Sequence, residues 1–262
     1  FQRLIRNIMT NRHIVIPARY NSSRLPGKLM LDLDGKPVIA HTIEVAKKLA
    51  SSVHVATDNE EIFNCAVKHG ANAIMTSDKH QSGTDRLAEA VGKLALPEQD
   101  IVINLQGDEP LISPKLLTQA ADLLERYPNA GIATLKQRIL NGDELMNPNV
   151  VKIAMGEDSS VVYFSRAPIP FNRDEMRGSV SGMPSGEYYR HIGLYVYRVG
   201  TLLNISEMKE HHLEATEKLE QLRALANGVR IVAEDALEIP HHGIDTEEDL
   251  FRLRSKLKVE SE

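Results

Sequence analysis

The sequence has a single cysteine, Cys65, among its 262 residues. One thiol cannot form a disulfide within the chain, and this scarcity is typical of proteins in reducing compartments. The sequence contains no run of about 18 apolar residues, so it predicts no membrane span. An excess of positive charge is missing too, because the formal net charge is −5. Since nucleic-acid-binding domains are usually basic, the sequence argues against nucleic acid as a partner.

The common glycine-rich signatures for nucleotide phosphates are also absent. The chain contains neither GxxxxGK[ST] nor GxGxxG, so nothing in it supports a P-loop NTPase or a dinucleotide-binding enzyme. The first residues, FQRLIRNIMTN, lack the apolar core that a signal peptide needs. We expect residues 1–12 to be an extension or a vector remnant, with Met9 a candidate natural start.

The first half of the chain alternates short apolar runs with helix-like segments. The runs that predict strands are HIVIPA (13–18), SVHVATD (52–58), NAIMTS (72–77) and DIVINLQGDEP (100–110). Apolar residues at helical spacing predict helices over 37–50, 59–71, 83–95 and 113–128. Strands and helices that alternate in this way predict an α/β fold with a doubly wound, mostly parallel, Rossmann-like sheet.

From about residue 130 the pattern changes. Extended segments lie close together at 131–139, 149–156, 160–170 and 190–199, which predicts antiparallel strands in a smaller mixed β/α lobe. The Gly/Ser-rich stretch 177–187 predicts a surface loop. Residues 211–228 predict one amphipathic helix that ends at Gly228.

Three cations stand on the loop that follows the first predicted strand. In IPARYNSSRLPGK, residues 16–28, they are Arg19, Arg24 and Lys28. Ligands of open α/β sheets collect at the carboxyl ends of the strands. Arginine grips phosphate oxygens bidentately, while lysine acts as a mobile point charge. The loop therefore predicts a phosphate site, and the alternative is a solvated basic turn.

Two aspartates are candidate ligands of Mg²⁺, which prefers carboxylates, waters and substrate phosphates. Asp108 lies in QGDEP at the end of a predicted buried strand, and Asp245 lies in HHGIDTEEDL. Both have ordinary structural alternatives: Asp108 could be a turn residue, and Asp245 or Thr246 could cap the helix that follows. Two carboxylates on either side of a triphosphate would form the metal clamp of phosphoryl chemistry.

Two further positions are candidates on local grounds. Asp58 ends the predicted strand 52–58, at the same kind of sheet edge as Asp108. His191 lies in YYRHIGLY, close to Arg190 and Tyr195. It is either a residue that faces a ligand or an ordinary structural histidine.

Several motifs together carry a family likeness. IPARYNSSRLPGK, VATD, HQSGTDRLAEA, NLQGDEPLI, VYFSRAPIPF, RHIGLYVYR, EKLEQLRAL and GIDTEEDL occur in this order over roughly residues 13–254. The chain resembles the CMP-Kdo synthetases, the 3-deoxy-manno-octulosonate cytidylyltransferases. The first motif is shared with other sugar nucleotidyltransferases, whereas QGDEPLI, YFSRAPIP and KLEQLR point to the Kdo enzymes.

The resemblance implies a nucleotidyltransferase that moves CMP from CTP to the anomeric 2-hydroxyl of 3-deoxy-D-manno-octulosonate (Kdo), for lipopolysaccharide biosynthesis. It also implies a magnesium-dependent, cytoplasmic homodimer. One domain would span residues 13–262, with a nucleotide-binding half at about 13–130. A sugar-binding and dimerisation part at about 131–230 and a return to the main sheet at 231–262, with a C-terminal helix, would follow.

Site residues follow from the same resemblance, position by position. The implied catalytic residues are Arg24, Lys28, Asp108 and Asp245, the last two also binding Mg²⁺. The implied CTP-binding residues are Arg19, Ser22, Arg24, Lys28, Asp58, Ser82, Gly83 and Gln106. The implied sugar-binding residues are Gln106, Arg166, His191, Tyr195, Glu217 and Gln221, with Arg166 a partner for the sugar carboxylate.

Three other functions compete with this one. The same chemistry could act on another acidic sugar, such as sialic acid or an amino-Kdo variant. A nucleotide-binding protein without catalysis is a second alternative, but the presence of Asp108, Asp245 and all three loop cations argues against it. A nucleotide-sugar glycosyltransferase usually carries a DxD motif, which GDEP is not.

Overall fold

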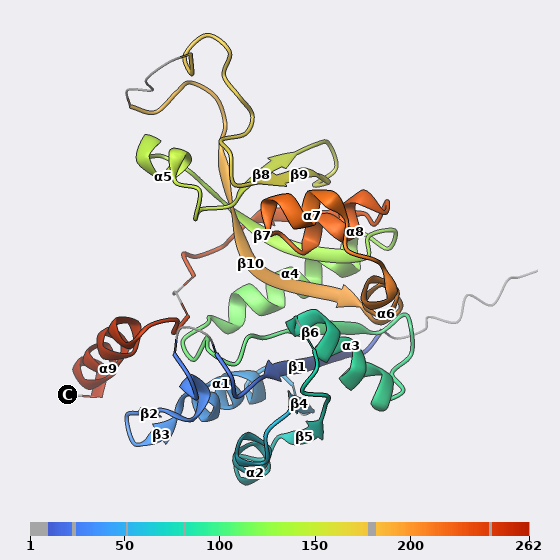
Figure 1. The fold of residues 1–262 in the computed structure, drawn as a ribbon, viewed down its shortest axis with the longest axis vertical. Helices are drawn as coiled ribbons and strands as arrows, with labels where there is room; N and C mark the ends of the chain where they lie inside the picture. Colours follow the sequence, from blue (N-terminus) through green and yellow to red (C-terminus); the bar gives the residue numbers. More distant parts are fainter. Residues whose placement is uncertain are drawn as a thin grey trace, which may run out of the picture.

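A computed structural model describes residues 10–22, 25–50, 52–80, 82–177, 182–240 and 243–261. Its main sheet runs in the order β11-β7-β10-β6-β1-β4-β5, and β8 and β9 join it beside β10 (Figure 1). Most neighbouring strands on this path are parallel, and β10 is antiparallel to both of its neighbours. The predicted α/β class with a mostly parallel sheet is confirmed.

The first half of the chain builds the parallel part of the sheet. Its strands are β1 (Arg12–Ala18), β4 (Val53–Thr57), β5 (Asn72–Met75) and β6 (Ile101–Asn104). The helices between and after them are α1 (Val38–Lys47), α2 (Glu60–Lys68), α3 (Gly83–Lys93) and α4 (Pro114–Arg126). A 3₁₀ turn, η1 (Lys28–Met30), and a small hairpin of β2 (Asp32–Leu33) and β3 (Lys36–Pro37) follow β1.

Helices cover both faces of the sheet, as a doubly wound fold requires. Ile14 and Ile16 of β1 lie in one buried cluster with side chains of α1 and α4. Val15, between them, lies in a second cluster with side chains of α3. Alternate residues of a strand point to opposite faces, so the continuous apolar run of β1 reflects a strand that is buried on both sides.

The second half adds the antiparallel strand and the mixed lobe that the sequence predicts. Its strands are β7 (Ile132–Arg138), β8 (Lys152–Met155), β9 (Val161–Ser165), β10 (Tyr189–Arg198) and β11 (Ile231–Asp235). Its helices are α5 (Gly142–Met146), α6 (Val199–Glu207), α7 (His212–Glu217), α8 (Gln221–Ala226) and α9 (Glu247–Ser261). In Figure 1, α5, β8 and β9 stand together at one end of the sheet. Residues 178–181 of the predicted loop 177–187 lie outside the described residues.

One predicted helix is wrong: residues 211–228 form two short helices, α7 and α8. The chain turns at Lys218, whose backbone is left-handed (φ 53°). Arg166 binds this turn, because its Nε donates to the carbonyl of Glu217 over 2.6 Å. The periodicity of the sequence is helical on both sides of the turn, so the break depends on a tertiary contact that the pattern does not contain.

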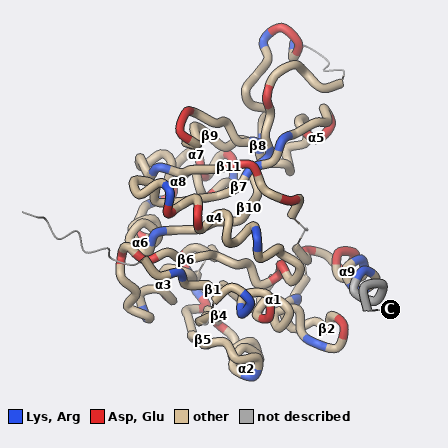
Figure 2. The backbone as a smooth tube through the Cα atoms, turned by 180° about the vertical axis from the view of Figure 1, so that it is seen from behind, with Lys and Arg blue, Asp and Glu red and all other residues tan. Residues whose placement is uncertain are grey.

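Charges of both signs are interspersed along the backbone in Figure 2. Within the described residues, no helix has the length and apolar character needed to cross a membrane.

Candidate active site

A cavity of about 420 Å³ opens where β1 and β6 end, at the carboxyl edge of the parallel sheet. We call it the large cavity. Its wall includes eight predicted site residues: Arg19, Ser22, Lys28, Ser82, Gly83, Gln106, Asp108 and Asp245. These residues come from four separate segments of the chain, so the fold gathers most of the predicted nucleotide site in one place.

The cationic loop after β1 is shaped by Gly27. Gly27 has a left-handed backbone (φ 67°), and its N–H donates to the carbonyl of Tyr20 over 3.1 Å. Glycine adopts this conformation without steric cost, and the turn directs Lys28 into the cavity wall. Arg19 is exposed on the same wall. Arg24 lies outside the described residues, so its role stays a prediction.

Lys28 joins the two predicted metal ligands. Its Nζ contacts Asp108 Oδ2 closely, lies 3.2 Å from Asp245 Oδ1 and donates to the carbonyl of Ile244 over 2.9 Å. The Ile244 N–H also donates to the carbonyl of Asp108 over 2.9 Å. Two carboxylates from distant parts of the sequence are therefore within reach of one position in the cavity wall.

The helix cap that Asp245 could have provided is made by Thr246. The Thr246 hydroxyl accepts from the Asp249 N–H over 3.2 Å, and Asp249 Oδ2 accepts from the Thr246 N–H over 3.0 Å. This reciprocal pair is a capping box at the start of α9. The Asp245 side chain is not the N-cap and lies at the cavity instead.

A third carboxyl group lies beside these two aspartates. Burial and then the charges of Asp108 and Asp245 raise the pKa of Glu109 to about 8. Gly243 allows its backbone to approach the turn that follows β6, because a Cβ at this position would lie 3.1 Å from the carbonyl oxygen of Asp108. A cation at this site would weaken the effect of the two aspartates on the pKa of Glu109.

The donor set at this edge fits Mg²⁺ better than a softer metal. Asp108 and Asp245 supply carboxylate oxygens, and magnesium is commonly held by one or two carboxylates plus substrate phosphates. Within the described ranges, no three His, Cys, Asp or Glu side chains gather into an all-protein metal site. The two aspartates would thus hold the ion only together with a ligand.

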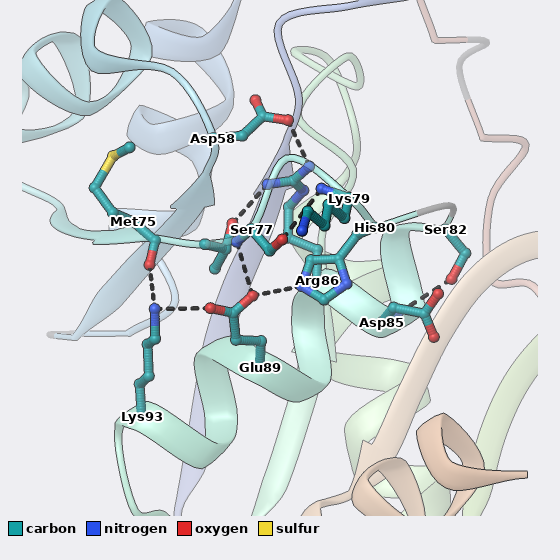
Figure 3. A network of polar contacts seen from close by, with 11 residues as sticks. Asp58, Met75, Ser77, Lys79, His80, Ser82, Asp85, Arg86, Glu89 and Lys93 are labelled. Atoms are coloured by element: carbon teal, nitrogen blue, oxygen red, sulfur yellow. Dashed lines mark hydrogen bonds and ion pairs between the residues drawn. The ribbon is translucent and has the colours of Figure 1, made fainter.

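The start of α3 forms another part of the wall of the large cavity. Ser82 caps α3 by accepting from the Asp85 N–H over 3.1 Å, and Gly83 follows as the first helical residue. Arg86, one turn later, donates to Asp58 Oδ2 over 2.7 Å and to the Thr76 hydroxyl over 2.6 Å (Figure 3). Asp58 does not line the cavity; it holds Arg86, which does.

A second cavity of about 170 Å³, the small cavity, shares Gly83, Gln106 and Glu220 with the large one. Its other lining residues include Thr84, Asn104, Tyr195, Tyr197 and Gln221. The Tyr195 hydroxyl and Glu220 Oε1 are buried without a hydrogen-bond partner among the described residues. Buried polar atoms are normally paired, so these two atoms point to a polar ligand in the small cavity.

Three predicted sugar-binding residues do not line either cavity. Arg166 donates to the carbonyls of Glu217 and Pro148 over 2.6 and 3.0 Å. The Glu217 carboxylate accepts from the Ser165 hydroxyl over 2.6 Å and from the Arg166 N–H over 2.9 Å. Both residues support the turn between α7 and α8, and Glu220 reaches the cavity from the far side of that turn.

His191, the third of these residues, packs behind Tyr195. Their ring centroids are 5.2 Å apart, and His191 Nε2 lies 2.9 Å from the Thr134 hydroxyl. Burial, and then the charge of Arg190, lower the pKa of His191 to about 3. His191 therefore remains neutral near pH 7 and supports a cavity residue.

Among the cavity-wall residues that sequence reasoning missed are His80, Arg86, Glu220 and Tyr197. His80 and Arg86 lie within the motif HQSGTDRLAEA, and Glu220 lies within EKLEQLRAL. The motifs were visible, but only the turn at Lys218 decides that Glu220 and not Glu217 faces the cavities.

Comparisons with known proteins agree over nearly the whole chain. A family model described as cytidylyltransferase matches residues 13–231. The chain is 48% identical over 249 residues to the 3-deoxy-manno-octulosonate cytidylyltransferase of Neisseria gonorrhoeae, covering 94% of this chain and 98% of the relative. It is 47% identical to the enzyme of that name from Haemophilus influenzae, covering 93% and 97%.

A solved structure of CMP:2-keto-3-deoxy-manno-octonic acid synthetase complexed with CTP is also similar. It is 39% identical, the alignment covers 96% of this chain and 100% of that one, and the TM-score is 0.85. A solved structure of a cytidylyltransferase from Leptospira borgpetersenii is 19% identical, and the alignment covers 95% of this chain and 87% of that one with a TM-score of 0.59. At this identity the likeness shows a shared fold.

Proposed function

This chain belongs to the 3-deoxy-manno-octulosonate cytidylyltransferase family, and we propose that it activates Kdo with CTP to give CMP-Kdo and pyrophosphate. The observation that carries the proposal is the meeting of Lys28, Asp108 and Asp245 at the wall of the large cavity. This arrangement suits a magnesium-bound triphosphate at the carboxyl edge of the sheet.

The two cavities divide the substrates between them. CTP would occupy the large cavity, whose wall carries Arg19 and Lys28. The sugar would occupy the small cavity, where the Tyr195 hydroxyl and Glu220 Oε1 have no hydrogen-bond partner among the described residues. The reacting atoms would meet at the shared wall of Gly83, Gln106 and Glu220.

The reaction joins the 2-hydroxyl oxygen of Kdo to the α-phosphorus of CTP, while the bond from that phosphorus to the bridging oxygen of pyrophosphate breaks. The hydroxyl proton leaves to solvent. Little covalent chemistry falls to the protein, so positioning and charge neutralisation carry the catalysis. Arg19, Arg24 and Lys28 would neutralise the charge that grows on the departing pyrophosphate.

Asp108 and Asp245 would hold Mg²⁺ against the triphosphate. The bound ion would supply charge stabilisation of the phosphoryl oxygens. Lys28, which joins the two carboxylates in the free protein, would then turn toward a phosphate. Its flexible stem and three donors allow such a change of partner.

The proposal also covers the pathway, the compartment and the oligomeric state. The activated sugar would serve lipopolysaccharide biosynthesis, and the enzyme would act as a cytoplasmic homodimer. The single cysteine of the sequence supports the reducing compartment. Sedimentation of the purified protein would test the dimer separately from the activity.

Pyrophosphate release tests the function directly. Purified protein is given CTP and Mg²⁺ with Kdo, with sialic acid or with an amino-Kdo variant, and the product is identified by its mass. We expect release with Kdo and far less with the other two sugars. The Asp108→Asn variant controls for contaminating activity. Preferred use of sialic acid would contradict the sugar assignment, and no release with any sugar would contradict the enzyme.

A further inference from the structure

A histidine in the wall of the large cavity is paired with a carboxylate behind it. His80 lines this cavity, and its ring Nε2 contacts Glu89 Oε2 (Figure 3). Glu89 is itself held by Lys93, at 2.7 Å, and by the N–H of Ser77, at 2.8 Å. The imidazole is therefore fixed by a carboxylate that has two further donors.

The partners of Glu89 decide which nitrogen of His80 carries the proton. Burial alone would raise the pKa of Glu89, but the hydrogen bonds from Lys93, Ser77 and His80 outweigh it and lower the pKa to about 2. An ionised carboxylate only accepts hydrogen bonds, so Nε2 must carry a hydrogen. In the neutral ring, Nδ1 is then an acceptor.

Nδ1 of His80 is available to a ligand. The second ring nitrogen points away from Glu89 in Figure 3. No described residue forms a hydrogen bond with it. Because His80 lines the large cavity, its ring is within reach of a ligand bound there.

The strand order places His80 away from the metal ligands. Along the edge β6-β1-β4-β5, Asp108 follows β6, Arg19 follows β1 and His80 follows β5. Neighbouring strands are about 4.8 Å apart, so three spacings separate the ends of β6 and β5 by about 14 Å. If the triphosphate lies at Asp108 and Arg19, the nucleoside extends toward His80.

We propose that His80 is a specificity-determining residue for the base, accepting a hydrogen bond through Nδ1 from the exocyclic amino group of cytosine. Glu89 is a positioning residue that fixes the imidazole. Uracil carries a carbonyl oxygen in place of that amino group, which would set two acceptors against each other. A site built around such a bond rejects the analogue that lacks the donor. This inference rests on the proposed function.

The test is the ratio of the dissociation constants of UTP and CTP, measured by calorimetry with excess Mg²⁺. Both nucleotides carry the same triphosphate, so effects of the phosphates and the metal cancel in the ratio. We expect His80→Gln to lower the preference for CTP about tenfold, the scale of one hydrogen bond to a ligand. A glutamine amide reaches the Nε2 position, so this variant keeps a partner for Glu89 but loses Nδ1.

Two further variants complete the experiment. Glu89→Gln should lower the ratio by a smaller factor, because the tautomer of His80 is no longer fixed. His13→Gln is the matched control: His13 Nε2 also pairs with a carboxylate, Asp100 Oδ2 at 2.9 Å, but at the other end of β1. It should leave the ratio unchanged.

The outcomes separate this inference from the proposed function. A ratio that falls in His80→Gln and stays at the wild-type value in His13→Gln would support the inference. Equal ratios in wild type and His80→Gln would overturn it, even if the enzyme releases pyrophosphate normally. Failure of the wild type to bind CTP at all would instead overturn the proposed function.

Discussion

The main-chain N–H of Ile244 donates a hydrogen bond to the carbonyl of Asp108 over 2.9 Å. This contact ties the loop before α9 to the turn after β6, and it carries Asp245 to the same ammonium group that Asp108 contacts. A main-chain hydrogen bond therefore brings the two aspartates together. Substitutions of their side chains leave this bond in place and can test their roles without moving the loop.

Asp108→Asn and Asp245→Asn should each lower turnover by more than about 100-fold, because the amide keeps the shape but loses the charge that balances the metal. Thermal stability should remain close to wild type. The double variant should be little worse than either single one, since residues that act as a unit are not additive. Pyrophosphate release against magnesium concentration is the measurement.

Thr246→Ala is the matched control for Asp245. Thr246 makes the capping box with Asp249, so its loss should cost about 1 kcal/mol of stability with a small effect on turnover. Near-normal activity in Asp245→Asn would leave Asp108 to bind the metal without it and would rule out the two-carboxylate clamp.

Arg24→Ala should weaken the use of CTP by about 1.5–3 kcal/mol, because a charge-assisted contact to phosphate is lost. Lysine at this position should restore only part of the loss, since the bidentate geometry is missing. Steady-state kinetics at varied CTP measure both. Arg138→Ala, which removes an exposed partner of Glu187, is the control; kinetics of Arg24→Ala equal to those of the control would remove Arg24 from the site.

Tyr195→Phe should leave the stability of the free protein unchanged or raise it by up to about 1 kcal/mol, because it removes a buried hydroxyl without a partner. The same change should raise the KM for Kdo more than that for CTP. Tyr197→Phe is the contrast: the side chains of Thr84 and Asn104 lie within reach of its hydroxyl, so we expect a loss of stability. Urea unfolding and kinetics with varied sugar distinguish the two.

Arg166→Ala should destabilise the free protein by about 1–3 kcal/mol, because the guanidinium donates to main-chain carbonyls at the α7–α8 turn. Its effect on the KM for Kdo would then be indirect, through Glu220. A direct contact with the sugar carboxylate predicts the reverse: unchanged stability and a large rise in KM. Unfolding curves recorded without substrate decide between them.

The pH dependence of stability should report His191. Burial lowers its pKa to about 3, whereas an unfolded histidine has a pKa of about 6.5. Between these values the unfolded chain binds the extra proton, so stability is fully present above about pH 6.5 and falls as the pH decreases toward 3. The slope for one histidine is at most about 1.4 kcal/mol per pH unit.

Urea unfolding at several values between about pH 7 and about pH 5 measures this slope, above the range in which most carboxylates titrate. His191→Gln should have a shallower slope than wild type. Burial also lowers the pKa of His54, so His54→Gln should reduce the slope independently. A slope that neither substitution changes would mean that these rings are accessible to water in the folded protein.

Local physics made much of the molecule predictable from the sequence. The apolar run of β1, the start of α4 and the spacing of strands and helices depend on neighbours a few residues apart, and each appears where the pattern predicts it. Arg19, Lys28 and Asp108 follow strands, so the rule that ligands bind at the carboxyl edge already placed them in one region.

Tertiary structure decided what no local pattern contains. Lys28 and Asp245 meet across 217 positions of sequence, a contact that depends on the pairing of distant segments. The turn at Lys218 rotates Glu220 into the cavities and turns Glu217 away, because Arg166 binds the carbonyls there. Periodicity records which face of a segment is apolar, but the partner of each polar side chain is set by the assembled fold.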